Sequence, residues 1–199
     1  MTVRAATTLA IALSIAVPAW LGAQAARPPG SVPEIFSATA QAKSAKGTAS
    51  GALEVQMHRY TPEFDRKTVE EALRLGGYPR FLTALRNAPE VGQLTLAGGQ
   101  PYPIRYARET LEGETRTIVI VTDRPVYFVG SARTDAKPRA GFEVAVVRLQ
   151  VDGTGKGRGT MAGAARVRPD GNGGVLLDDY ADELIAVTGI TRKPAGQAQ

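Results

Sequence analysis

Residues 115–129, TRTIVIVTDRPVYFV, decide the fold of this chain. Ile118, Val119, Ile120 and Val121 form a run of four β-branched residues, so both faces of a strand built from them are apolar. Such a strand has to be covered on both sides, and we therefore predict a central strand over residues 115–122. Residues 123–125 end it, since proline cannot donate to the ladder, and residues 126–129 are predicted to form a separate arm.

Alternating apolar and polar residues predict further strands on either side of this centre. In residues 51–60, Leu53, Val55 and Met57 share one face, which is typical of a half-buried strand. A loop centred on Gly113 predicts a hairpin that joins residues 102–111 to the central strand. The remaining predicted strands are residues 35–43, 93–96, 141–151, 158–167, 175–177 and 184–191.

A helical segment interrupts the strands after the second one. Thr61 is predicted to be the N-cap, with Pro62 at the first helical position and a stop at Gly76-Gly77. Glu63 with Lys67, and Glu70 with Arg74, have the spacing of helical ion pairs on a solvated face. A second short helix is predicted over residues 79–87.

The class that follows is α+β, with an antiparallel β-meander of eight or nine strands. The sheet is expected to form a partly closed barrel or a two-layer roll, because open sheets of this size expose edges that invite aggregation. A pair of helices near the N-terminus is inserted in it. A helix-grip architecture ranks second, because such domains close with a long C-terminal helix and no helical pattern follows Leu149.

The N-terminus predicts export. Arg4 precedes the apolar run at residues 9–17 and the triplet Ala23-Gln24-Ala25, so residues 1–25 are predicted to be a signal peptide and the protein periplasmic or extracellular. An uncleaved anchor is the alternative, and the run is short for a membrane span. Residues 26–33 are then a flexible lead-in, residues 34–193 a single β-rich globular domain, and residues 194–199 a disordered tail.

Composition argues against several classes of protein. The net charge of +5 comes from cations spread along the chain, and the basic stretch at residues 156–168 has no aromatic residue, so no nucleic-acid partner is expected. The only tryptophan, Trp20, belongs to the predicted signal peptide, so no stable membrane insertion is expected after cleavage. With one histidine and no cysteine, neither a disulfide nor a transition-metal site or other cofactor is predicted.

Two candidate catalytic or metal-binding features are weak. His58 shares a strand face with Glu54 and could act as a base, but Glu54 lies roughly 13 Å away along a strand, so a surface histidine is the preferred interpretation. The carboxylates Asp178, Asp179, Asp182 and Glu183 lack the spacing of a calcium loop, and a solvated acidic turn facing the basic strand is preferred.

The glycines in residues 153–159, GTGKGRG, lie between two predicted strands. A phosphate-binding loop is followed by a helix, so this run is predicted to be a hairpin turn.

The most informative polar residues stand where the central strand ends. Arg124 is predicted to bond carbonyl groups or to pair with Asp123 or Glu109. The alternative is that its guanidinium recognises an anionic ligand, in a site made by Arg105, Tyr106, Asp123, Arg124 and Tyr127.

Four segments together resemble a family of small exported bacterial proteins that carries no assigned activity. They are residues 103–110 (PIRYARET), 118–128 (IVIVTDRPVYF), 142–157 (FEVAVVRLQVDGTGKG) and 176–191. The resemblance covers residues 36–193. It implies an exported β-rich domain and assigns no ligand or catalytic residue.

Three functions remain open from the sequence. The first is a non-enzymatic exported module that binds a small molecule or an envelope protein near Arg105 and Arg124. The second is a hydrolase or lyase that uses His58 with Glu54 or a carboxylate of residues 178–183. The third is a secreted enzyme inhibitor that inserts the loop at residues 130–140 into its target.

Overall fold

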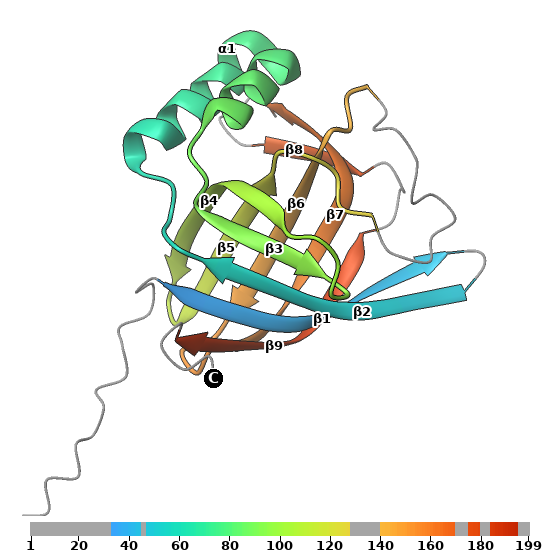
Figure 1. Ribbon diagram of the computed structural model, residues 1–199. Helices are drawn as coiled ribbons and strands as arrows, with labels where there is room; N and C mark the ends of the chain where they lie inside the picture. Colours follow the sequence, from blue (N-terminus) through green and yellow to red (C-terminus); the bar gives the residue numbers. More distant parts are fainter. Residues whose placement is uncertain (1–32, 45–46, 128–139, 170–174, 180–183, 195–199) are drawn as a thin grey trace, which may run out of the picture.

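The computed structural model describes residues 33–44, 47–127, 140–169, 175–179 and 184–194 (Figure 1). The predicted signal peptide, the lead-in up to residue 32, most of the loop at 130–140 and the tail after residue 194 lie outside the described residues. In this part of the chain the secondary structure consists of one helix and nine strands. They are β1 (Glu34–Ser44), β2 (Gly47–Met57), α1 (Glu63–Asn87), β3 (Gly92–Leu96), β4 (Tyr102–Glu112), β5 (Thr115–Thr122), β6 (Val144–Val151), β7 (Lys156–Pro169), β8 (Val175–Asp179) and β9 (Ile185–Pro194).

The strands close into a barrel. All the pairings are antiparallel and follow the order β6-β5-β4-β3-β2-β1-β9-β7, and β7 pairs back to β6, so eight strands complete the ring. β8 pairs with β7 outside the ring. The predicted antiparallel sheet is confirmed, and of the two expected shapes the barrel is the one observed, fully closed. β9 departs from the meander because it returns to lie between β1 and β7.

The central strand is covered on both faces, as predicted. Ile118 and Ile120 of β5 point into the barrel and are fully buried. Val121 points outward beneath α1 and is 6% exposed, whereas Val119 is half-buried on the same outer face. The interior is filled by apolar side chains from all eight strands of the ring, among them Phe36, Leu53, Leu94, Ile104, Val147, Met161 and Val187. The barrel interior is therefore a packed apolar core. A second apolar core lies between α1 and the outer wall of the barrel.

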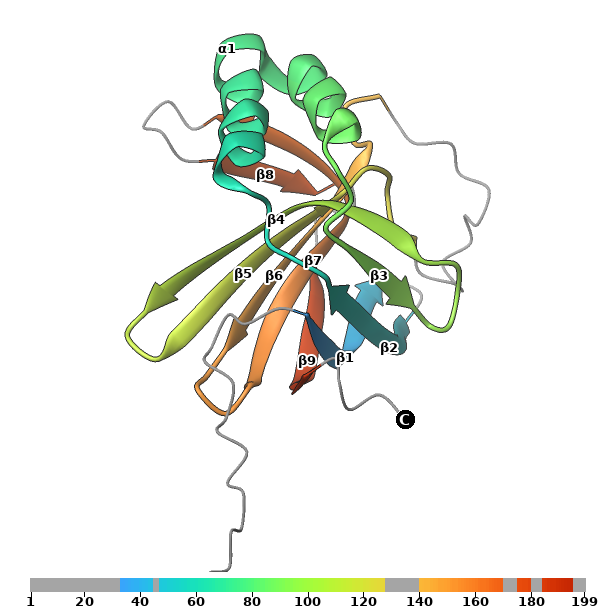
Figure 2. The same cartoon turned by 60° about the vertical axis from the view of Figure 1, so that its left-hand side comes forward.

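The prediction of two helices is wrong. One helix, α1, spans both predicted segments and bends at Gly77, whose φ of 64° and ψ of −165° interrupt the helical backbone. Glycine adopts this conformation without the penalty that a β-carbon brings, and Pro79 then restarts the helix with its fixed φ. The apolar side of both arms packs on the outer face of β4–β7, and Figure 2 shows the arms meeting at the bend.

The start of α1 also differs from the prediction. Thr61 does not cap the helix; its hydroxyl accepts from the backbone N–H of Ala107 at 2.8 Å, while its own N–H donates to the Ala107 carbonyl. Thr61 thus fixes the connection to β4 instead. The Glu63–Lys67 pair is present.

Glu70 has partners other than the one predicted. It pairs with Arg66, one turn earlier, rather than with Arg74. Arg108 and Tyr106 of β4 also reach Glu70, so this carboxylate faces the barrel as well as its own helix.

The glycine run is a hairpin turn in its first half only. Gly155 has a φ of 79° in the turn between β6 and β7, as predicted. Gly157 and Gly159 instead lie in β7 against β6, where an added Cβ would stand 1.9 Å from the Gln150 carbonyl oxygen and 2.3 Å from that of Arg148. Only glycine permits this close approach, which lets β7 curve and pair with both β6 and β9.

The predicted arm at residues 126–129 is not a strand where the structure describes it. Val126, which belongs to no strand, donates its N–H to the carbonyl of Gly163 in β7 at 2.8 Å, and residues 128–129 lie outside the described part. The other predicted strands are present with shifted ends. Among the described residues, no helix is both long and apolar enough to cross a membrane.

Candidate functional site: a groove on the outer wall of the barrel

The five residues proposed from sequence as a binding site lie in separate places. Arg105 and Asp123 are brought together: Nε of Arg105 is 3.1 Å from Oδ2 of Asp123, and Nη1 donates to the carbonyl oxygen of Ala88 at 3.2 Å. The two side chains are 25% and 19% exposed. This pair ties β4 and the end of β5 to the end of α1.

Arg124 points elsewhere. Its Nη2 donates to the carbonyl oxygen of Pro101 at 2.9 Å, and its guanidinium carbon lies 5.0 Å from the centre of the Tyr102 ring. A carbonyl acceptor and an aromatic face hold this exposed cation against the β3–β4 connection. Tyr127 is half-buried at the end of the described segment.

Tyr106 is the one of the five that lines the groove described below. It points outward from β4 beneath α1, and its hydroxyl donates to Oε1 of Glu70 at 2.7 Å. Burial raises the pKa of Tyr106, and the hydrogen bond to Glu70 raises it further. The phenol is therefore held protonated and acts as a hydrogen-bond donor.

The residues of the hydrolase hypothesis are not assembled in the described part of the chain. His58 is exposed directly after the end of β2, and Glu54 accepts a hydrogen bond from Gln56 at 2.7 Å. Asp178 is held by Arg168, whose Nε and Nη2 donate to it at 2.6 and 2.8 Å. Asp182 and Glu183 lie outside the described residues.

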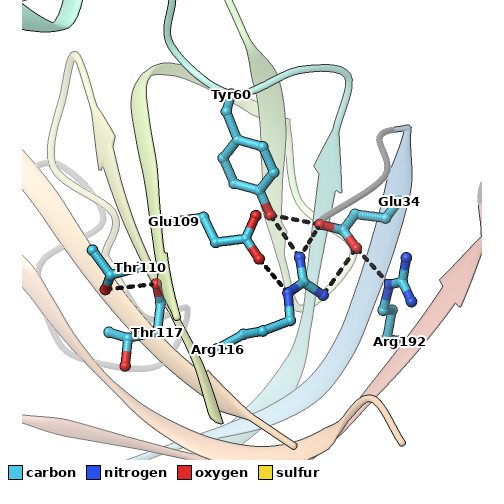
Figure 3. Close-up of polar contacts among 7 residues, drawn as sticks. All are labelled: Glu34, Tyr60, Glu109, Thr110, Arg116, Thr117 and Arg192. Carbon is cyan, nitrogen blue, oxygen red and sulfur yellow. Dashed lines mark hydrogen bonds and ion pairs between the residues drawn. The ribbon is translucent and has the colours of Figure 1, made fainter. Parts of the chain in front are cut away.

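A buried ionic cluster that the sequence reasoning missed joins several strands of the barrel (Figure 3). Its members are Glu34, Tyr60, Glu109, Arg116 and Arg192. Arg116 is 2% exposed and Glu34 is fully buried. Nη2 of Arg116 lies 2.9 Å from Oε1 of Glu34 and 3.0 Å from the hydroxyl of Tyr60, and its Nε donates to Glu109. Arg192 donates to the second oxygen of Glu34.

The positive and negative charges of the ionic cluster are equal in number. Burial opposes the ionisation of Glu34, but hydrogen bonds from Arg116 and Tyr60 outweigh it and hold the pKa of Glu34 below its usual value. Burial raises the pKa of Tyr60, and Glu34 raises it further, so the phenol donates to the carboxylate at 2.6 Å. Two carboxylates face two guanidinium groups, and the members come from both ends of the chain. The ionic cluster is a structural connection between β1, β4, β5 and β9.

A signal for this cluster is present in the sequence. Side chains alternate along a strand, so Arg116 has the same parity as the buried Ile118 and Ile120. Glu34 likewise has the parity of Phe36. A charge that falls on the inward side of two separate strands, with opposite sign, indicates a buried pair.

The groove that we consider the candidate site lies between α1, the outer wall of the barrel and β8. It has a volume of about 820 Å³. Figures 1 and 2 both show α1 and β8 beside the same part of the barrel. Its apolar lining is contributed by Val69, Leu73 and Phe81 of α1, Val119 and Val121 of β5, Val146 of β6, Ala162 and Val167 of β7, and Val175 and Leu177 of β8.

The sequence explains why this surface stays open. α1 covers the outer wall where its apolar side chains reach, but Val119 remains half-buried and Val175 and Leu177 are 58% and 38% exposed. β8 extends the wall beyond the ring and presents these two side chains on the groove side, because they are two residues apart on one strand. Large apolar side chains left exposed together mark an interaction surface more often than those scattered singly.

Charged side chains surround the apolar lining. Lys67, Glu70, Glu71 and Arg74 lie on the helix side, and Arg108 and Arg148 on the barrel side. Lys67 pairs with Glu63 at 2.8 Å, and Arg108 lies 3.5 Å from Glu70. Within the described residues, no group of three or more histidine, aspartate or glutamate side chains is placed to hold a metal ion. The groove thus combines an apolar lining with charged side chains around it.

Comparisons with known proteins found no similar protein. The chain matched no protein-family model, no curated protein and no solved structure.

Proposed function

We propose that this protein is a non-enzymatic binding module, exported from the cell, that holds an apolar small molecule in the groove between α1 and the barrel wall. The observation that supports it is the groove itself. Its volume of about 820 Å³ falls within the range of roughly 300–1,000 Å³ that is typical of small-molecule sites. Such sites are mostly apolar with a few placed polar groups, and this groove has an apolar floor with the Tyr106 hydroxyl at its edge.

The barrel interior is not proposed as the site, because its side chains are packed. Residues that would line a central cavity, such as Ile104, Ile118 and Met161, are fully buried and belong to one continuous core. Glu34 and Arg116 of the ionic cluster are likewise buried and paired. A ligand would have to displace packed side chains to enter, whereas the groove is already open.

The proposal is tested with a neutral apolar fluorophore, N-phenyl-1-naphthylamine. We expect saturable binding at one site per chain, with the emission increase that follows transfer of the dye from water to an apolar surface. Val119→Trp places a large side chain in the groove and is expected to abolish binding while the melting temperature stays close to that of the wild type. The substituted position is half-buried, so the indole has room.

The matched control is Leu111→Trp, which adds the same side chain at a 63% exposed position of β4 outside the groove lining. Binding should be unchanged in this variant. Undiminished binding in folded Val119→Trp protein, or no saturable binding in the wild type, would refute the groove as the site.

A further inference from the structure

We infer that the ligand is an amphiphilic anion with a single long apolar chain, such as a long-chain carboxylate, whose charged end is bound by Arg148 and Arg158. This inference rests on the proposed function, since it places the apolar chain in the same groove. It adds a second element, a cationic recess at the margin of the groove, defined by Arg148, Gln150, Arg158, Gly159 and Thr160.

The recess and the groove are continuous. The recess has a volume of about 180 Å³, and two of its residues, Arg148 and Thr160, also line the groove. Strand register explains the arrangement: Arg148 of β6 faces Thr160 of β7, and Gln150 faces Arg158 on the same outer side. Arg158 is therefore the diagonal neighbour of Arg148, at a distance that both guanidinium groups can span toward one anion.

Gly159 contributes only backbone to the floor of the recess. It pairs with the inward-facing Leu149, so the outward-facing side chains on either side of it in β7 are those of Arg158 and Thr160. The close approach of β6 and β7 at this point requires a glycine.

Several cations of this surface have no acidic partner among the described residues. Among the described residues, Arg148, Arg158 and Arg74 form no ion pair, whereas Arg66, Lys67 and Arg108 each have a carboxylate within 4 Å. The groove and the recess together carry five cations, at positions 67, 74, 108, 148 and 158, against the two carboxylates Glu70 and Glu71. An anionic group is the complement to this surplus.

The two features together select one class of ligand. An anion without an apolar part would leave the exposed Val175 and Leu177 in water, and a neutral apolar molecule would leave Arg148 and Arg158 without a counter-ion. A chain of methylenes with a terminal carboxylate fills both regions. The planar guanidinium group suits it, because its N–H donors match two carboxylate oxygens.

The experiment compares three ligands with the same chain below their micelle concentrations, each measured by displacement of the neutral fluorophore. They are dodecanoate, dodecanol and dodecyltrimethylammonium. We expect dodecanoate to bind about tenfold more tightly than dodecanol, and dodecyltrimethylammonium to bind most weakly. Shortening dodecanoate to decanoate should weaken binding about 15-fold, because each buried methylene contributes about fourfold.

Variants then test the two arginines. Arg148→Gln and Arg158→Gln are each expected to lower the affinity for dodecanoate about threefold and to leave the affinity for dodecanol unchanged. Lys43→Gln removes a cation from the outer side of β1 and should alter neither affinity. Raising the salt concentration should lower the affinity for dodecanoate and leave that for dodecanol unchanged, because salt screens the attraction between exposed charges.

The outcomes separate this inference from the proposed function. If the neutral fluorophore and dodecanol bind but dodecanoate gains nothing over dodecanol, the anionic ligand is refuted and the apolar site stands. If neither binds, both are refuted. Binding to vesicles of anionic lipid without binding of free dodecanoate would identify a membrane-contact surface instead. A dimer whose interface blocks the fluorophore would identify a second copy of the chain as the occupant, and either result would overturn the inference.

Discussion

Replacing Glu34 by glutamine removes one charge from the ionic cluster and leaves its shape intact. The carboxylate has no contact with water and accepts hydrogen bonds from Tyr60, Arg116 and Arg192. In the variant, Arg116 would keep only the carboxylate of Glu109, and Arg192 would lose the carboxylate with which it pairs. One positive charge would then remain uncompensated in the ionic cluster.

The magnitude follows from the burial of the pair. Removing one partner of a buried ion pair typically costs about 3–5 kcal/mol, because the other charge stays desolvated without its counter-ion. For a domain of this size, a loss of about 4 kcal/mol lowers the melting temperature by roughly 10 °C. Arg116→Met should cost a similar amount. The double variant should cost less than the sum of the two, because it removes the excess charge that each single change creates.

The pH dependence gives a second measurement. The folded-state pKa of Glu34 is below its usual value, so the stability that its charge contributes is present above about pH 4.3, the ordinary pKa of a glutamate. That contribution is lost as the pH falls through the lower, folded-state value. The difference in free energy of unfolding between wild type and Glu34→Gln should therefore be constant from about pH 5 to 8 and shrink below about pH 4.

Urea unfolding followed by far-ultraviolet circular dichroism measures both effects, with Glu112→Gln as the control. Glu112 is an exposed carboxylate on the same barrel, so its loss should leave the urea midpoint unchanged. A cost below about 1 kcal/mol for Glu34→Gln, strict additivity in the double variant, or a difference as large at pH 3 as at pH 7 would each refute a buried ionic connection between these strands.

Three further substitutions test the fold. Gly77→Ala should cost about 1 kcal/mol, since alanine is disfavoured at a φ of 64°, and the melting temperature should fall while groove binding is kept. Gly159→Ala should lower the free energy of unfolding by more, at least about 2 kcal/mol as measured in urea, because the new Cβ would lie 2.3 Å from a backbone oxygen. An unchanged free energy of unfolding would show that β6 and β7 separate easily. Thr122→Val should cost about 1–3 kcal/mol, because the buried hydroxyl accepts from the Ala145 N–H at 3.0 Å and the variant leaves that donor unpaired; hydrogen exchange at Ala145 should rise.

Local patterns predicted most of the strands and their antiparallel pairing. The run at Ile118–Val121 required cover on both faces, and alternation in β2 identified Leu53, Val55 and Met57 as inward-facing, which the structure confirms. Closure of the ring was not predictable from the same patterns. It depends on β9 pairing with β1 and β7, and no local signal states which distant strand a given strand will join.

The helix and the candidate groove show a different limit. Gly76-Gly77 correctly marked a break in the helical backbone, but the sequence does not distinguish two helices from one bent helix, because that depends on the packing of both arms on one wall. The groove was missed because its lining comes from α1 and five strands, each of which has an ordinary apolar side. Tyr106 was predicted as a site residue together with Arg105 and Arg124, in a site other than the groove.

The adjacency of β1 and β9 has a consequence for how the chain is made. The ring stays open until residues 185–194 have left the ribosome, because β9 is the only described strand that bridges β1 to β7. Until then, β1 and β7 each have an edge whose backbone N–H and C=O groups are unpaired and can bind another chain. A protein that lacks β9 would expose both edges permanently, so such chains are expected to aggregate, and the pairing of β9 is the step that removes both edges.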